Sequence, residues 1–346
     1  MTLPAEAARG VSCTTVNAPD PFVLPVPEEE SLRLEECLRS MVRQGDPFLD
    51  EVASHLVNAG GKRLRPALAM TSAALNGAPA SDDVLQGAVC VELVHLASLY
   101  HDDVMDEATR RRNVVSVNGR WGNLVAIVAG DLLLARSAEI AASLGTEVAA
   151  LIATTLARLC QGQLSEVQAA YRVDRTEESY LRTIADKTAA LMAAACRIGG
   201  ITAGLERPQI DALTRFGECL GIVFQIRDDV LDVVASESEL GKPPGQDLAE
   251  GTYTLPVQRA LRDRQSGPRL REILGRPLGY EEVEVARKLV AGSTGIAAAA
   301  EVARQYAGEA AEVAAGLGEG AVPRSLAELG LGLLDDLERS TRALAS

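Results

Sequence analysis

The chain has 346 residues, of which 47% are hydrophobic and 24% are charged, and its formal net charge is −14. At roughly 100–200 residues per domain, this length allows one large domain or two ordinary ones. The apolar fraction excludes a disordered protein, and the acidic balance argues against a nucleic-acid partner, because phosphate binding needs a basic surface. Clusters of Lys and Arg in such an acidic chain therefore need a functional explanation.

The cysteines and the hydropathy pattern indicate the compartment. The six cysteines form no C-x-x-C pair, and the three histidines offer few ligands for zinc. We therefore expect reduced thiols in a cytoplasmic protein. No run of 18 uncharged apolar residues and no hydrophobic leader is present, so neither a transmembrane helix nor a signal peptide is predicted.

Residues 1–27 contain five prolines among small residues, which predicts a disordered N-terminal lead-in. From residue 28 to 346, Ala, Leu, Glu and Arg dominate, and the breaks between helices fall at Gly, Pro, Asn and Asp. Helices are predicted at about 28–44, 47–59, 64–77, 82–107, 118–143, 146–170, 176–203, 207–236, 254–265, 280–292, 296–316 and 323–345.

Two of these helices are predicted to be central. Residues 84–104 and 220–234 are apolar on most helical faces, which is typical of a buried helix. Strand patterns are nearly absent. Val114–Val117 followed by Asn118-Gly119 predicts at most a small hairpin. The predicted fold is one large all-α domain, a bundle of long antiparallel helices.

The first candidate site is the segment DDVMD at residues 102–106, inside the first buried helix. Asp102 and Asp106 are four residues apart, so their carboxylates lie on one helix face with Cβ atoms roughly 5–6 Å apart. Like charges at this spacing destabilise a helix, and burial adds a desolvation cost. A cation must compensate, and carboxylate oxygens favour Mg²⁺.

The same pattern, DDVLD, returns at residues 228–232 in the second buried helix. One such motif can be a solvated acidic turn, but two in buried helices predict two acidic walls facing a cavity. Such walls would hold divalent metals that bind substrate phosphates. Asp228, Asp229 and Asp232 are therefore candidate metal ligands, with Asp102 and Asp106 on the opposite wall.

Two basic clusters accompany the acidic motifs. The segment GGKRLRP at residues 60–66 places three cations on a turn that opens a helix, and Arg110–Arg112 follow the first acidic motif closely. N–H groups at a helix start, together with Lys and Arg, form an anion site. Each cluster alone could be a solvated surface, but together they indicate a polyanionic ligand.

The two DDxxD motifs, the GGKRLRP turn and the arginines after the first motif together resemble the trans-type polyprenyl diphosphate synthases, from about residue 30 onward. The resemblance implies the isoprenoid synthase fold with a central cavity, a homodimer, and Mg²⁺ with three ions per active site. It also implies Mg²⁺-dependent head-to-tail condensation of isopentenyl diphosphate with farnesyl or geranylgeranyl diphosphate. A transient membrane contact at product release is compatible with it.

The resemblance also assigns roles to residues. Asp102 and Asp106 resemble ligands of two Mg²⁺ ions, with Asp103 supporting them. Asp228 resembles the ligand of a third ion, with Asp229 and Asp232 in its outer shell. The residues similar to diphosphate-binding groups are Arg111 for the allylic substrate, Lys62, Arg63, His95 and Arg112 for isopentenyl diphosphate, and Lys242 as a further contact. The residues similar to those lining the carbocation are Lys187, Thr188 and Gln225.

Three positions depart from the family pattern. Thr252 and Gln246 stand where lysines are frequent, and Asn113 stands where Gly is usual. The loss of a lysine at Thr252 could weaken the binding of the allylic substrate. Because both acidic motifs are complete, we still expect an active enzyme.

In the family, bulky residues just before the first acidic motif limit product length. Here Ala97 and Ser98 occupy the fifth and fourth positions before it, and Val94 lies one turn further up the helix. These small side chains predict an open floor and a long product of C35–C50, with C45 favoured, suited to a quinone side chain. Alternatively, they serve helix packing, and another residue such as Leu132 or Leu164 closes the tunnel.

Other interpretations remain open. A synthase with a C15–C20 product and a non-catalytic subunit of a heteromeric synthase both belong to the same family, although eroded motifs would mark the latter. A di-iron bundle would need a second Glu-x-x-His besides Glu92–His95, and none is present. A terpene cyclase would have no need of residues 60–66 or of the second acidic motif.

Overall fold

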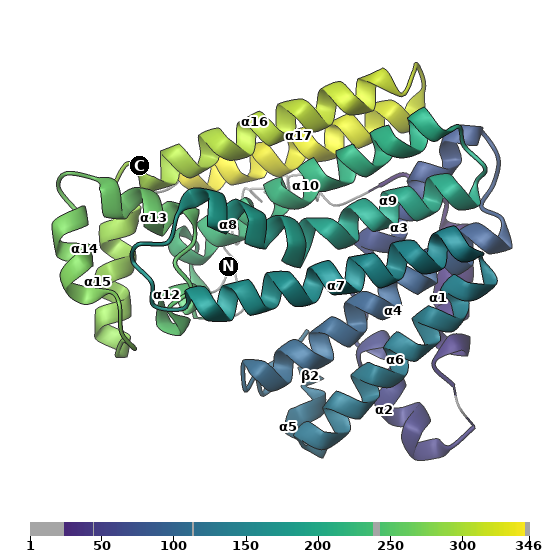
Figure 1. Ribbon diagram of the computed structural model, residues 1–346, viewed down its shortest axis with the longest axis horizontal. Coiled ribbons are helices and arrows are strands. Elements are labelled where there is room, and N and C mark those ends of the chain that lie inside the picture. The colour runs from purple at the N-terminus through teal and green to yellow at the C-terminus, as the bar shows by residue number, and fades with distance from the viewer. Residues whose placement is uncertain (1–23, 44, 113, 238–242, 343–346) are drawn as a thin grey trace, which may run out of the picture.

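The computed structural model describes residues 24–342 apart from 44, 113 and 238–242. This part of the chain is almost entirely helical, as predicted (Figure 1). The helices in its first half are α1 (Glu28–Met41), α2 (Pro47–Asn58), α3 (Leu64–Ala73), η1 (Ala74–Asn76), α4 (Asp82–Met105), α5 (Val117–Trp121), α6 (Asn123–Ser143) and α7 (Thr146–Ala169). The helices in its second half are α8 (Glu177–Ile184), η2 (Ala185–Ala189), α9 (Ala190–Thr202), α10 (Arg207–Val234), α12 (Gln246–Glu250), α13 (Leu255–Arg262), α14 (Gly267–Ile273), α15 (Tyr280–Ala291), α16 (Gly295–Gly316) and α17 (Ala321–Arg342).

The long helices pack in a continuous series. Helix α4 packs against α6 and α9, α9 packs against α10, and α10 packs against α16, which in turn contacts α17 (Figure 1). The predicted central helices are indeed buried, because α4 and α10 each contact long helices on two sides. Helix α4 also has the length and apolar composition of a membrane span, but 72% of that apolar window is buried in the core.

Local sequence fixes where the two central helices begin. The Ser81 side chain accepts a hydrogen bond from the Val84 N–H and caps α4. Helix α10 begins with a reciprocal cap between Glu206 and Gln209 and has a proline in its first turn. Each helix thus starts at a defined residue and carries its acidic motif near its C-terminal end.

Helix α10 lies unusually close to the segment η2–α9. A Cβ atom on Gly221 would lie 2.4 Å from the Ala189 Cα, and one on Gly217 would lie 2.7 Å from the Ala193 Cα. Only glycine allows the two backbones to approach this closely. The second acidic motif is therefore held at a fixed distance from η2.

The structure corrects several predicted boundaries. The helix expected at 118–143 is divided at Gly122, whose φ is +88°. A small hairpin does form, but it pairs β1 (Arg110–Arg111) with β2 (Val114–Val115), and Asn118-Gly119 lie in α5 instead of in a turn. Helices α12 and α14 were not predicted, because each has seven residues or fewer and little periodicity. Of the predicted lead-in only 24–27 are described, and Leu24 is buried.

Candidate active site

The first acidic motif lies at the C-terminal end of α4. Asp102 is in the last turn of the helix and Asp106 is the residue that ends it. Burial, together with the charge of Asp106, raises the pKa of Asp102 to about 6. The negative end of the helix dipole also disfavours carboxylates here. Among the described residues, none forms a hydrogen bond or an ion pair with the Asp102 carboxylate, so this motif needs a cation.

Asp103 is engaged differently from its neighbours in the motif. Its side chain is fully buried, and its Oδ1 accepts bonds from Arg111 at 2.7 Å (Nε) and 2.6 Å (Nη2). The hairpin brings Arg111 back to α4, and Asn118 donates a hydrogen bond to the Asp103 carbonyl at 2.9 Å. Asp103 therefore orients Arg111, whose guanidinium remains one-third exposed.

Lys187 and Thr188 lie on η2, a single π-helical turn between α8 and α9. Such turns contain an extra residue and are frequent at functional sites. Lys187 forms an ion pair with Glu166 of α7. Burial opposes its charge, but Glu166, Asp102 and Asp106 together raise the pKa of Lys187, so the ammonium stays charged.

A chain of buried hydrogen bonds connects η2 to the second acidic motif. Thr188 Oγ1 donates to Gln225 Oε1 at 2.7 Å, and Gln225 Nε2 donates to Asp229 Oδ1 at 2.8 Å. The Tyr180 hydroxyl donates to the other Asp229 oxygen at 2.5 Å. Burial raises the pKa of Asp229 to about 7. Because Asp229 takes up the Gln225 amide N–H, the carbonyl oxygen of Gln225 is directed toward Thr188.

The remaining carboxylates of the second motif have separate surroundings. Asp232 is buried and accepts bonds from the backbone N–H of Asp247 at 3.1 Å and of Gln246 at 3.3 Å, so it holds the start of α12. Asp228 is half-exposed and lies 2.8 Å from Arg227 Nη1. Lys242, which was predicted to contact a diphosphate, lies outside the described residues.

A cavity of about 430 Å³ brings the two motifs together. Its walls include Asp106 from the first motif and Asp229 from the second, whereas Asp102, Asp228 and Asp232 are not among its lining residues. The predicted residues that also line it are Arg111, Lys187, Thr188 and Gln225. Within the described ranges, no three His, Cys, Asp or Glu side chains form a ready-made metal site. A metal held here would need further ligands from a bound substrate.

A second cavity of about 360 Å³ is basic. Its basic lining residues include Lys62, Arg63, Arg65, His95 and Arg112, and the carboxylates of Glu92 and Asp228 also line it. Burial and the four nearby arginines lower the pKa of His95 well below its usual value, so the imidazole is neutral. Burial also lowers the pKa of Arg65, whose Nε is buried and has no hydrogen-bond partner among the described residues.

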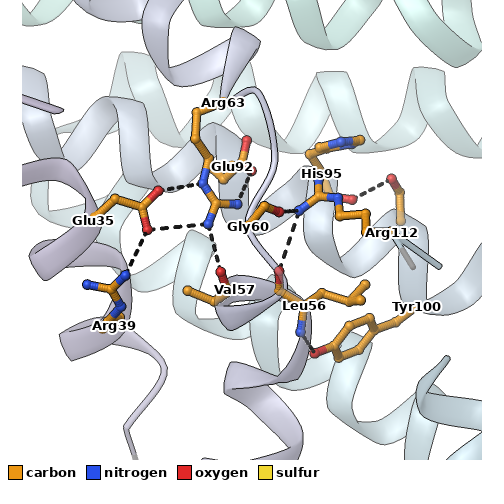
Figure 2. A network of polar contacts seen from close by, with 11 residues as sticks. Glu35, Arg39, Leu56, Val57, Gly60, Arg63, Glu92, His95, Tyr100 and Arg112 are labelled. Atoms are coloured by element: carbon orange, nitrogen blue, oxygen red, sulfur yellow. Dashed lines mark hydrogen bonds and ion pairs between the residues drawn. The ribbon is translucent and has the colours of Figure 1, made fainter. Parts of the chain in front are cut away.

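Arg63 lines the basic cavity, as predicted for this turn, but its guanidinium is engaged by carboxylates. Figure 2 shows its guanidinium between Glu35 and Glu92. The Nε–Glu35 and Nη1–Glu92 distances are 2.7 and 2.9 Å, and Nη2 donates to the Val57 carbonyl at 2.8 Å. Its backbone has a left-handed φ of 47°, which is costly for an arginine. These contacts hold the turn in place and pair the Arg63 guanidinium with two carboxylates.

Arg65 was not selected from the sequence, although a usable pattern was present. Arg65 belongs to the same basic segment as Lys62 and lies in the first turn of the helix that begins at Leu64. Arg112 is held against the turn by the carbonyls of Leu56 and Gly60. The φ of Gly61 is +150°, a backbone conformation that side chains other than glycine rarely adopt, so glycine is favoured at this position.

The predicted length-determining residues lie on the core face of α4. Val94 and Ala97 are fully buried, and Ser98 donates a hydrogen bond to the His95 carbonyl at 2.8 Å. None of the three lines either cavity described above. The open floor below them therefore stays a prediction.

Residues 46–291 match the sequence profile of the polyprenyl synthetase family. The chain belongs to this family. It is therefore a prenyltransferase, and its structure is the all-α isoprenoid synthase fold, as predicted. Among the polyprenyl synthetases, it is 42% identical to a nonaprenyl diphosphate synthase of Mycobacterium tuberculosis over 282 residues, which cover 80% of this chain and 84% of the relative.

Two further relatives are informative about this polyprenyl synthetase. Heptaprenyl diphosphate synthase component 2 of Geobacillus stearothermophilus is 41% identical, over 67% of this chain and 72% of that protein. A crystal structure of geranylgeranyl pyrophosphate synthase from Corynebacterium glutamicum, complexed with calcium and isoprenyl diphosphate, superposes with a TM-score of 0.79. The two chains are 38% identical, and the match covers 89% of this chain and 95% of that one.

Proposed function

We propose that this polyprenyl synthetase condenses isopentenyl diphosphate with an allylic diphosphate, head to tail, to form a long all-trans polyprenyl diphosphate. The observation that carries the proposal is the pairing of two different anion sites. One cavity combines several carboxylates, of which Asp229 is buried, with Lys187 and Arg111, and the other is lined by more cations than carboxylates. The first suits a diphosphate that must leave together with metal ions, and the second suits one that stays intact.

The carboxylates of the first motif fit Mg²⁺. Asp102 is partly buried and has a raised pKa, and among the described residues no ion pair to its carboxylate is present, so a divalent ion would stabilise it in addition to the nearby charge of Lys187. Asp102, Asp106 and Asp228 would hold the ions, three per site by family resemblance, with Asp229 and Asp232 supporting. When bound, Mg²⁺ supplies positive charge that stabilises the departing diphosphate.

The side chains around this site then have distinct roles. Arg111 and Lys187 bind the allylic diphosphate and stabilise its charge as the C–O bond breaks. The side-chain oxygens of Gln225 and Thr188, which are hydrogen-bonded to each other, place negative partial charge beside the allylic cation. The double bond of isopentenyl diphosphate attacks this cation, and the released diphosphate accepts the proton lost from the product. The reaction needs no protein nucleophile.

The basic cavity is the proposed site for isopentenyl diphosphate. Lys62, Arg65 and Arg112 provide charge, and the neutral His95 provides a hydrogen bond. We add Arg65 to this assignment, because it lines the cavity and its buried Nε has no hydrogen-bond partner in the described structure, whereas the guanidinium of Arg63 is paired with Glu35 and Glu92. Arg63 instead keeps the turn in the conformation that presents its neighbours.

Small side chains at Val94, Ala97 and Ser98 support a product of C35–C50, with C45 favoured for a quinone side chain. The nonaprenyl relative supports this range, whereas the geranylgeranyl relative supports the C20 alternative. The test is to incubate the purified chain alone with Mg²⁺, farnesyl diphosphate and excess labelled isopentenyl diphosphate, and to size the products. A ladder that reaches C35 or beyond supports the proposal, and a stop at C20 refutes the predicted length.

The same assay tests the heteromeric alternative. The component 2 relative raises the possibility of a partner chain, but both acidic motifs are complete here. Extension by the isolated chain would exclude a need for a partner. If the wild type extends no allylic starter and is as inactive as an Asp102→Asn variant, catalysis by this chain alone is refuted.

We also infer a homodimer in the cytoplasm. Apolar side chains are exposed along α6, at Leu124, Ile127 and Val128, and along α7, at Leu164 and Val167. An exposed stripe of this kind marks a protein interface. Light scattering coupled to gel filtration should give the dimer mass for the wild type and a lower mass for Leu164→Glu. The matched change Leu32→Glu, at an exposed leucine of α1, should leave the mass unchanged.

A further inference from the structure

Arg175 is a buried cation whose role neither the sequence pattern nor the family assigns. It lies between α7 and α8, and only 8% of its surface is exposed. Its Nη2 donates to Thr183 Oγ1 at 2.7 Å, and its Cζ lies 5.7 Å from the centre of the Tyr180 ring. Its Nε is buried without a hydrogen-bond partner in the described part of the chain. No carboxylate of that part lies within ion-pair distance of it.

Such a side chain is costly for the unliganded protein. A guanidinium remains charged even though burial lowers the pKa of Arg175. Removing a charge from water costs several kcal/mol unless an anion compensates it. Glu166 and Asp229 are the nearest sources of negative charge, but Glu166 is paired with Lys187, and both Asp229 oxygens accept hydrogen bonds from other groups. The compensation is therefore incomplete without a ligand.

The position of Arg175 indicates which ligand completes it. Arg175 lines the 430 Å³ cavity that also contains Arg111, Lys187 and Asp106. Thr252 lines the same cavity and carries no charge. A diphosphate offers several oxygens to cations spread around such a cavity, and a guanidinium can bind two of them at once.

We propose that Arg175 binds the diphosphate of the allylic substrate, as a further cationic group beside Arg111 and Lys187. The inference rests on the proposed function, because it takes the occupant of this cavity to be the leaving diphosphate. Tyr180 and Thr183 hold the guanidinium in place, so binding needs little further ordering of the side chain.

Inorganic pyrophosphate with Mg²⁺ is the probe, and calorimetry measures its affinity for the full chain. Arg175→Met removes the charge but keeps the apolar stem, and Arg175→Lys keeps the charge without the fork. The matched control is Arg182→Met, at a position on α8 that is 71% exposed and paired with Glu178. We expect Arg175→Met to weaken pyrophosphate binding at least tenfold, Arg175→Lys to weaken it less, and the control to change it less than twofold.

Two further measurements separate binding from a structural role. In the condensation assay, Arg175→Met should raise the KM for farnesyl diphosphate and leave the KM for isopentenyl diphosphate unchanged. The Tm of its ligand-free form should not fall, because an uncompensated buried charge has been removed. A lower Tm together with an unchanged pyrophosphate affinity would overturn the proposal and make Arg175 a structural residue.

The outcomes also distinguish this inference from the proposed function. If the wild type binds pyrophosphate and extends farnesyl diphosphate while Arg175→Met binds equally well, only the role of Arg175 is refuted. If the wild type neither binds pyrophosphate with Mg²⁺ nor extends any allylic starter, the proposed function fails, and the role of Arg175 fails with it.

Discussion

The ion pair between Arg63 and Glu92 allows a quantitative prediction, because one partner is almost completely buried. The Glu92 side chain is 2% exposed and that of Arg63 is 9% exposed, whereas Glu35 on the other side is 27% exposed. Replacing Arg63 by Met leaves Glu92 buried without its nearest cation. Breaking a buried pair in this way costs about 3–5 kcal/mol, and loss of the more exposed Glu35 contact adds about 0–1 kcal/mol.

The neighbouring arginines moderate this value. The charges of Arg65 and Arg112 also act on Glu92 and would oppose part of its desolvation. We therefore expect Arg63→Met to lower the free energy of unfolding by about 3 kcal/mol, at the low end of the range for a broken buried pair. With an unfolding entropy of about 2.1 cal/mol/K per residue, this corresponds to a Tm roughly 4 °C lower.

The assay is thermal and urea unfolding of four proteins that form a double-mutant cycle: the wild type, Arg63→Met, Glu92→Gln and the double variant. Because Gln carries no charge to leave uncompensated, the double variant should recover at least half of the stability lost in Arg63→Met. Arg63→Met should also raise the KM for isopentenyl diphosphate, since the turn carrying Lys62 and Arg65 loses its support. A Tm within 1 °C of the wild type, or a double variant no more stable than Arg63→Met, would refute this reasoning.

Three further predictions concern other parts of the site. Gly221→Ala places a Cβ atom 2.4 Å from the Ala189 Cα, so η2 must shift. We expect this overpacking to lower the free energy of unfolding by about 1–3 kcal/mol, measured by thermal unfolding, and to lower kcat. The control Gly308→Ala, at an uncrowded helical glycine, should change neither. Tyr180→Phe removes the hydroxyl that donates to a buried Asp229 oxygen. We expect the free energy of unfolding to fall by about 1–3 kcal/mol and kcat to fall as well. An unchanged pyrophosphate affinity would separate this effect from that of Arg175. His95 has a lowered pKa in the folded protein, so between that pKa and about 6.5 the unfolded state binds the extra proton and stability falls as the pH falls, by up to about 1.4 kcal/mol per pH unit. In urea unfolding at pH 5–7, His95→Gln should show a shallower pH dependence, and an identical slope would contradict the assignment.

Much of the architecture follows from local sequence. The helix-forming composition and the apolar surroundings of the acidic motifs are properties of neighbouring residues, and they predicted an all-α bundle with two buried acidic helices. The spacing of Asp102 and Asp106 alone indicated a cation site, because like charges on one buried helix face need compensation whatever the packing around them.

Packing between distant segments decided the rest. Glu35 and Glu92 lie 28 and 29 residues away from Arg63 in the sequence and form hydrogen bonds with its guanidinium. Which cation of the turn at 60–66 is left to face a ligand therefore depends on these distant residues. The π-helical turn that carries Lys187 is accompanied by the close approach of Gly221, and the isolation of Arg175 depends on which partners Glu166 and Asp229 take. These choices are not encoded in residue type or spacing, because they are set by which side chains meet once the helices pack.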